Sequence, residues 1–228
     1  MTTRARRKPL SRDRVLTTAV ALADAEGVHA LTMRRLAAEL GVKAMSLYYH
    51  LPAKEALLDG VVEAVLAEID TAVERLDTEA AAVDATGAGA EWRTRLRRQF
   101  LTARQVMVQH PWAPALLCSR RITPPGVCAY YRGILLTLIE AGFTCDLAHR
   151  ALYAFGSLPL GFTQEVFNPA PPDSNINVAA LGGCDSRAEF EFTLDLLLDG
   201  LDRLRPDSHH PMHDAGWPRL HPTQSPGS

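Results

Sequence analysis

The chain lacks a long hydrophobic run, closely spaced cysteines and any stretch that alternates apolar and polar residues. No segment approaches the roughly 18 to 20 uncharged residues that a membrane-spanning helix needs, so we expect a cytoplasmic protein with no membrane insertion. The four cysteines have no CxxC spacing, which speaks against a zinc site or a redox pair. Because the alternation typical of half-buried strands is missing, the fold is expected to be all-α.

Recognisable catalytic patterns are missing as well. Ser157 lies in FGSLPLG, which lacks the first glycine of a GxSxG nucleophile elbow. His110 and His149 show no spacing that is typical of metal ligands. We therefore expect that the protein is not an enzyme and that it holds neither a metal nor a cofactor.

Charge is distributed unevenly along the 228 residues, although the net charge is only −2. Residues 1–54 contain ten lysines and arginines against four acidic residues, and residues 55–228 contain fourteen against twenty-two. A basic amino-terminal part on an acidic remainder is typical of a nucleic-acid-binding module joined to a domain that does not touch the polyanion. The alternative is a disordered basic segment, because four of these charges lie between residues 4 and 8.

Apolar residues recur every three or four positions in several segments, which predicts a series of helices. Helices are expected at 11–25, 33–40, 44–50, 52–77, 91–110, 124–141, 146–164 and 188–204, with loops at 77–90 and 168–187. Thr32 supplies a side-chain oxygen that can cap the second helix, and Pro52 suits the first turn of the long fourth helix. Segments 1–10 and 206–228 are expected to be disordered.

The most informative segment is LTMRRLAAELGVKAMSLYYHLPAK, residues 31–54. A helix-turn-helix needs a small residue where two helices cross, a glycine in the turn and apolar residues that hold the helices together. Ala37 is the small residue, and Gly41 lies where the chain must turn with a positive φ. The apolar set is Leu36, Leu40, Val42 and Leu47. We therefore predict a helix-turn-helix DNA-binding domain over 11–54 and a larger helical domain over 55–205.

The helix at 44–50 is then the recognition helix that enters the major groove. Arg34 and Lys43 have the reach to donate to guanine, and Ala44 and Met45 offer apolar surface to a thymine methyl group. The residues expected to hold phosphates are Thr32, Ser46, Tyr48 and Lys54.

Tyr48 and Tyr49 are adjacent in this helix, so both cannot point into a core. We expect both to lie near the groove, with aromatic packing inside the hairpin as the alternative. For His50, packing at the helix end and contact with DNA are supported equally.

These segments together resemble the tetracycline-repressor (TetR) family of bacterial regulators. LTMRRLAAELGV and SLYYHLPAKEALLD carry the similarity over residues 11–62, and FEFTLDLLLDGLDRL resembles the last helix of that family. The resemblance implies a homodimer held by a four-helix bundle of the helices at 146–164 and 188–204. It also implies a ligand cavity in the larger domain and a fourth helix that transmits the signal. The DNA contacts that it implies fall on Thr32, Arg34, Ala44, Met45, Ser46, Tyr48, Tyr49 and Lys54.

The expected function is that of a transcriptional repressor, which leaves its double-stranded operator DNA when a small-molecule effector binds. The ligand-binding candidates are polar or aromatic residues on otherwise apolar helices: Gln99, Arg104, Trp112, Tyr131 and Phe155. Asp70 stands where the repressor that names the family has a drug-binding histidine, which speaks against a magnesium-tetracycline ligand. The alternative function is a helix-turn-helix regulator whose larger domain only dimerises or binds a protein partner.

Overall fold

The computed structural model describes residues 9–81, 91–120, 123–167 and 186–205. All regular structure in these ranges is helical, which confirms the expected all-α fold class. The helices are α1 (Arg12–Glu26), α2 (Met33–Leu40), α3 (Ala44–Tyr48), α4 (Lys54–Ala81), α5 (Glu91–Gln109), α6 (Ala113–Ser119), α7 (Pro125–Glu140), α8 (Cys145–Phe167) and α9 (Ser186–Arg203), with the 3₁₀ turn η1 (Val28–Ala30) after α1.

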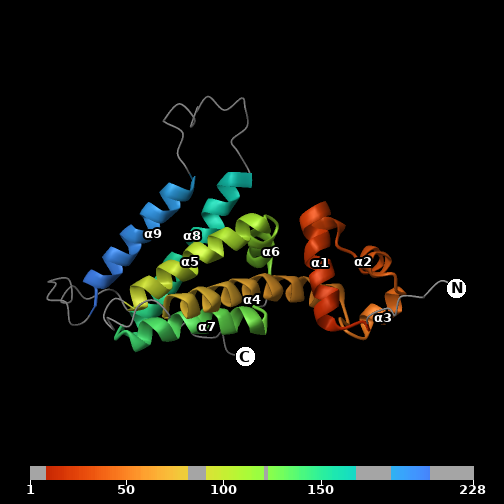
Figure 1. Cartoon of the computed structure of the whole chain (residues 1–228), viewed down its shortest axis with the longest axis horizontal. Helices are drawn as coiled ribbons and strands as arrows, with labels where there is room; N and C mark the ends of the chain where they lie inside the picture. Colours follow the sequence, from red (N-terminus) through yellow and green to blue (C-terminus); the bar gives the residue numbers. More distant parts are fainter. Residues whose placement is uncertain (1–8, 82–90, 121–122, 168–185, 206–228) are drawn as a thin grey trace, which may run out of the picture.

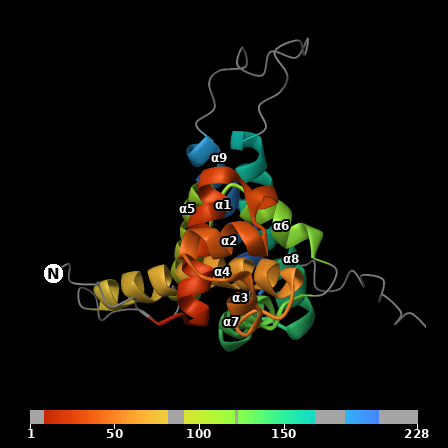
Figure 2. The same cartoon turned by 90° about the vertical axis from the view of Figure 1, so that its right-hand side faces the viewer.

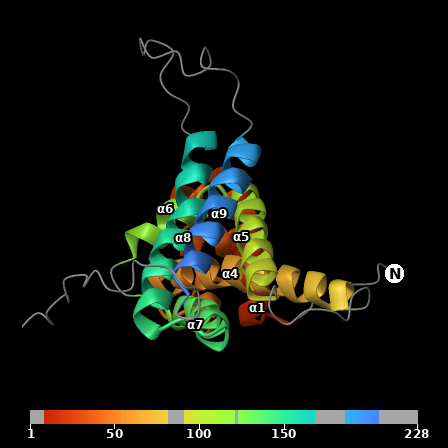
Figure 3. The same ribbon diagram turned by 90° about the vertical axis from the view of Figure 1, so that its left-hand side faces the viewer.

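The helices form a small amino-terminal group and a larger body, which α4 connects (Figure 1). Helices α1, α2 and α3 lie together at one end, and α4 runs from them into the body. Within the body, α4 packs against α5, α6 and α7, and α8 packs against α5, α7 and α9. Figure 2 shows α1, α2 and α3 from their own end of the molecule. From the opposite end, α8, α9 and α5 lie side by side (Figure 3).

One buried apolar cluster extends through both parts of the molecule. It includes Val15 of α1 and Val61 and Ile69 of α4, each of them fully buried. Gly60 lets α1 approach α4 closely, because a Cβ at this position would lie 2.6 Å from Cδ2 of Leu16. Burial of this apolar surface is the main favourable contribution to folding, and it ties the amino-terminal helices to the body.

Helix α4 differs from the prediction at both ends. Pro52 lies two residues before the helix instead of in its first turn, and the helix continues past the expected end at Asp77 to Ala81. Thr78 lies within the helix, and its hydroxyl donates to the carbonyl of Glu74, one turn earlier, at 2.8 Å. The loop predicted at 77–90 therefore starts later than expected.

Other boundaries also differ from the prediction. Helix α3 ends at Tyr48, so His50 lies in the following turn. The segment 112–118, for which no helix was predicted, contains most of α6 (Ala113–Ser119), which has Pro114 in its first turn. Seven residues are too few to show a helical period, which is why the sequence pattern missed this helix. Helix α8 continues to Phe167 with Pro159 inside it.

Residues 1–8, 82–90, 168–185 and 206–228 lie outside the described residues. The disordered ends predicted at 1–10 and 206–228 and most of the two predicted loops fall on these segments. Helix α9 begins at Ser186, within the last two positions of the loop predicted at 168–187.

Candidate DNA-binding surface and ligand cavity

A few local interactions build the helix-turn-helix. The Thr32 hydroxyl accepts a hydrogen bond from the Arg35 amide at 3.1 Å, and this cap starts α2. Gly41 ends α2 with a φ of 65°, in the left-handed region that favours glycine. The Val42 amide donates to the Ala37 carbonyl at 3.0 Å, which completes the turn into α3.

Helix α3 is anchored by one side chain and exposes the others. Leu47 is fully buried, whereas Met45 is 77% exposed and Tyr49, just after the helix, is 89% exposed. Tyr48 is also exposed, so neither tyrosine packs in the core of the hairpin. Large apolar and aromatic side chains held outside a core are typical of a surface that contacts another molecule.

Two adjacent arginines of α2 have different surroundings. Arg35 donates to Glu39 at 2.8 Å and to Glu26, and these hydrogen bonds, the one to Glu26 foremost, raise the pKa of Arg35. Arg34 is exposed, and no carboxylate within the described residues pairs with it. Its guanidinium therefore presents its donors to whatever approaches α2.

The remaining candidates for DNA contact lie on the same end of the molecule. Lys43 is the exposed residue that precedes α3, and Lys54 is the exposed first residue of α4. His50 is half-buried, and its ring packs edge-on against Tyr49 with 5.3 Å between the ring centroids. All ten residues singled out from the sequence thus lie on α2, α3, the adjoining turns and the first residue of α4, at the end of the molecule remote from α9 (Figure 1).

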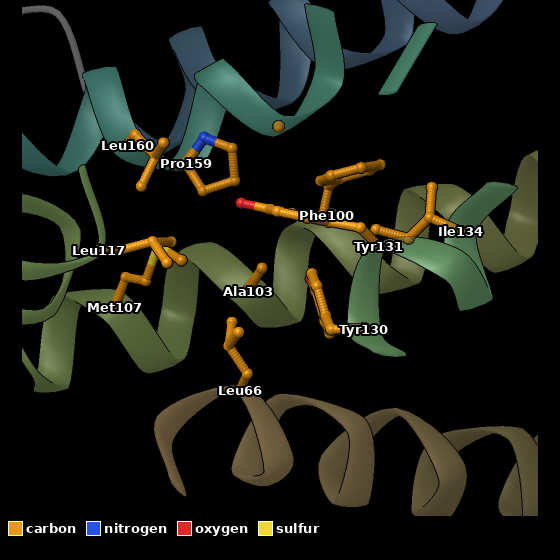
Figure 4. Close-up of a pocket in the computed structure, with 11 residues that line it drawn as sticks. Leu66, Phe100, Ala103, Met107, Leu117, Tyr130, Tyr131, Ile134, Pro159 and Leu160 are labelled. Carbon is orange, nitrogen blue, oxygen red and sulfur yellow. The ribbon is translucent and has the colours of Figure 1, made fainter. Parts of the chain in front are cut away.

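A narrow cavity lies in the body between α4, α5, α6, α7 and α8 (Figure 4). The space that these helices enclose is small, about 10 Å³, so a ligand must move the lining side chains apart to enter. The lining consists of Leu66, Phe100, Ala103, Met107, Leu117, Tyr130, Tyr131, Ile134, Gly156, Pro159 and Leu160. None of these side chains is charged, and the two tyrosine hydroxyls are their strongest hydrogen-bonding groups.

The two tyrosines bring hydroxyl groups into an apolar environment. Figure 4 shows the Tyr131 side chain extending across the cavity toward Pro159. Burial raises the pKa of Tyr130 and of Tyr131, so both hydroxyls keep their protons and can donate. A hydrogen bond with Gln99 opposes the shift at Tyr130, and Gln99 also donates to Asp70 at 3.4 Å.

Pro159 interrupts the hydrogen bonding of α8 beside the cavity. Because proline has no N–H, the carbonyl of Phe155, four residues earlier, lacks its usual helical donor. The Pro159 ring itself lines the cavity, on the side toward which the Tyr131 side chain extends (Figure 4).

Of the five ligand-binding candidates from the sequence, only Tyr131 belongs to the cavity lining. The other four have different partners: Phe155 stacks on Phe100 at 5.3 Å, Arg104 lies over the Phe190 ring at 5.6 Å, Gln99 donates to Asp70, and the Trp112 indole donates to Asp24. The sequence criterion selected polar and aromatic residues, whereas most of the lining is aliphatic. Aliphatic lining residues share the helical period of core residues, so no sequence signal separates the two groups.

Cys118, Cys128 and Cys145 are exposed free thiols. Within the described ranges, no three histidine, cysteine or acidic side chains are grouped so that they could hold a metal ion. None of the helices in those ranges combines the length and the apolar character that crossing a membrane requires.

Comparisons with known proteins agree with this arrangement. The family described as bacterial regulatory proteins, tetR family, matches residues 15–61. An HTH-type transcriptional regulator of Saccharopolyspora erythraea is 34% identical over 139 residues, which are 60% of this chain and 53% of that protein. This chain thus spans about half the length of that regulator.

Two other proteins match over most of their length. Tetracycline repressor protein class A from transposon 1721 of Escherichia coli is 30% identical over 195 residues, which are 85% of this chain and 82% of the repressor. The crystal structure of the Streptomyces coelicolor TetR family protein ActR in complex with actinorhodin matches with a TM-score of 0.66 and 25% identity, over 88% of this chain and 100% of ActR. With its helix-turn-helix, its helical body and these relatives, the chain belongs to the TetR family of bacterial regulatory proteins.

Proposed function

We propose that this chain is a homodimeric transcriptional repressor that binds operator DNA through α3 and leaves it when a small molecule occupies the cavity. The observation that carries the proposal is the orientation of α3, which buries Leu47 and exposes Met45 and Tyr49. ActR, which was solved with actinorhodin, supports a response to ligand in this chain too. Because the family consists of regulators, we assign no catalytic function, and because bacterial DNA lies in the cytoplasm, the protein acts there.

Base recognition is assigned to residues at the start of α2 and α3. Arg34 and Lys43 donate to guanine in the major groove, and Ala44 and Met45 contact a thymine methyl group. Their exposure, or half-burial in the case of Ala44, supports this role.

Contacts with the DNA backbone are assigned to side chains that surround these positions. Phosphate groups are bound by Thr32, Ser46, Tyr48 and Lys54, and Tyr49 and His50 lie beside the groove. The Thr32 hydroxyl oxygen already accepts the Arg35 amide, but its own hydrogen stays available for donation to a phosphate.

A recognition helix of five residues reads few base pairs, so specific binding needs two copies. In a two-fold dimer, the two α3 helices would enter successive major grooves about 34 to 36 Å apart. Helices α8 and α9, away from the DNA-binding end, carry the exposed side chains Tyr153, Phe192 and Leu196. This apolar surface supports the proposal that α8 and α9 form the dimer interface.

The cavity favours an uncharged and largely apolar ligand, since a charged group would lose its hydration against an uncharged lining. The Tyr131 hydroxyl would donate to an acceptor on that ligand. Leu66 belongs to α4 and also lines the cavity, so an occupant contacts the helix that leads to the DNA-binding domain. A tenfold loss of operator affinity requires that the ligand distinguish the two states by about 1.4 kcal/mol.

The DNA-binding proposal is tested with an operator selected by the wild-type protein from random duplexes. Arg34→Ala should weaken binding by about 1 to 3 kcal/mol and relax the preference at one base pair, because a base contact is lost. Lys54→Ala should weaken binding to all sequences alike and flatten the salt dependence. Arg75→Ala, on the exposed part of α4 away from α3, is the control that should bind as the wild type does. Equal, sequence-independent losses in the Arg34 and Lys54 variants would contradict the assignment.

The ligand proposal is tested by thermal shift with a panel of uncharged aromatic compounds that includes 2-naphthol. Compounds that stabilise the wild type should fail to stabilise Ala103→Phe, because the new ring fills the cavity. Ala129→Phe, at an exposed position of α7, is the matched control and should respond as the wild type does. If the whole panel leaves the wild type unshifted, the alternative function, a body that only dimerises or binds a protein, is favoured.

A further inference from the structure

A polar cluster joins α1 to the body at the corner between α5 and α6, where α6 lies nearest to α1 in Figure 1. His110 follows α5; its Nδ1 lies 2.8 Å from Oδ1 of Asp24 in α1, and its Nε2 lies 3.2 Å from Oε2 of Glu68 in α4. The Trp112 indole N–H donates to the same Oδ1 of Asp24 at 2.7 Å. The His110 and Trp112 rings are each only 7% exposed, whereas the Asp24 and Glu68 side chains are exposed to solvent.

The His110 ring lies between the two carboxylates of the cluster. Both ring nitrogens face carboxylate oxygens, which act only as acceptors. A proton on Nδ1 is therefore donated to Asp24, and a proton on Nε2 is donated to Glu68. Hydrogen bonds to an ionised carboxylate are about twice as strong as those between neutral groups. The cluster therefore fastens α1 to α4 and to the α5–α6 corner together.

The same corner borders the ligand cavity. Met107, one turn before His110, and Leu117 of α6 both line the cavity. The backbone between them stays hydrogen-bonded, since the Ala113 amide donates to the His110 carbonyl at 2.9 Å. A ligand that displaces Met107 or Leu117 therefore moves His110 and Trp112 with it.

We propose that His110 and Trp112 are positioning residues for DNA binding, which act by holding Asp24. Through Asp24 they fix α1, and with it the DNA-binding domain, at the angle that two operator half-sites require. The effect of ligand binding is then transmitted to the DNA-binding domain through α1 as well as through α4. The inference rests on the proposed function and adds to it a second connection between cavity and DNA, which bypasses the long helix.

The test compares Asp24→Ala with Asp13→Ala, which removes an exposed carboxylate from the same helix. The first readout is half-site spacing: the wild type should lose at least about tenfold in affinity when one base pair is inserted between half-sites, because its domains are held rigidly. The affinity of Asp24→Ala should fall less than about threefold after the same insertion, since a loosened domain tolerates both spacings. Asp13→Ala should behave as the wild type does. Asp24→Asn retains the Oδ1 acceptor and should restore the wild-type preference, which a loss of general stability would not explain.

The second readout is hydrogen exchange of the α1 amides without DNA. These amides should exchange at least about fivefold faster in Asp24→Ala than in Asp13→Ala. Equal exchange in the two alanine variants, or equal spacing preference, would overturn the proposal. If the wild type selects no duplex at all, the proposed function fails, and the exchange rates alone decide whether Asp24 holds α1.

Discussion

Gly41 shows at the scale of one residue how the angle between α2 and α3 is maintained. Its φ of 65° lies where a Cβ would crowd the following carbonyl oxygen. The turn that it permits is short, because the Val42 amide already bonds back to Ala37. A side chain at position 41 must either be strained in this conformation or change the direction in which α3 leaves.

We predict that Gly41→Ala lowers the free energy of unfolding by about 1 to 2 kcal/mol, the cost of the left-handed conformation for a residue with a Cβ. Gly133→Ala is the matched control, because Gly133 lies in helix α7 and a Cβ there meets nothing within 4 Å. The control should stabilise the protein by about 0.5 to 1 kcal/mol. Urea unfolding measures the free energy of unfolding of both variants. Equal stability of Gly41→Ala and the wild type would show that the turn does not depend on glycine.

Among whole elements, α7 illustrates how one side chain orients a helix. The Gly126 amide at its start donates to Oε1 of Glu63 at 2.8 Å, and Oε2 of Glu63 lies 3.4 Å from Arg12 of α1. A Cβ on Gly126 would lie 2.8 Å from Cγ of Glu63, so the glycine makes this close approach possible. The carboxylate also compensates the positive end of the α7 dipole. Glu63 thus connects α4 with α7 and α1.

We predict that Glu63→Ala destabilises the protein by about 1 kcal/mol, because α7 loses a cap that accepts a backbone amide. For a domain of this size the midpoint of thermal unfolding should fall by about 2 to 4 °C. Glu74→Ala, on an exposed part of the same helix, should leave the midpoint unchanged. A similar decrease in both variants would mean that the capping contact adds nothing to stability.

At the scale of the whole molecule, the proposed function requires a face through which two copies associate. Helices α8 and α9 lie side by side at the end opposite α3 (Figure 3), and Phe192 of α9 is 67% exposed. An aromatic side chain so exposed on a helix that is otherwise part of the core is expected at an interface between proteins. Under the proposed function, operator binding depends on this face, because only a dimer reads two half-sites together.

We predict that Phe192→Glu converts the dimer to monomers, since each copy would bring an unpaired charge into the interface. Operator affinity should fall by about a hundredfold or more, because the second half-site no longer binds in the same complex. Leu136→Glu, at an exposed apolar position of α7, is the control that should stay dimeric. Analytical ultracentrifugation measures the association, and a dimeric Phe192→Glu would place the interface elsewhere.

Local sequence determined the fold class and the helix-turn-helix. Thr32 caps α2 and Gly41 ends it where the sequence predicted, because a hydroxyl acceptor and a residue without Cβ act within three or four residues of their own position. The same short range explains why the exposed face around Met45 and Tyr49 could be predicted: burial of Leu47 in so short a helix leaves the other side to solvent.

The cavity and the contact between α1 and the body were decided only by tertiary structure. Met107 and Leu117 line the cavity although their apolar character matches that of any core residue, because the gap arises from how five helices meet. Trp112, which the sequence suggested as a ligand contact, instead donates to Asp24. Asp24 and His110 are 86 residues apart, and no local period or motif encodes a contact over that separation. Such pairs form only once the packing of α1, α4 and α5 has brought them together, so the sequence by itself does not reveal them.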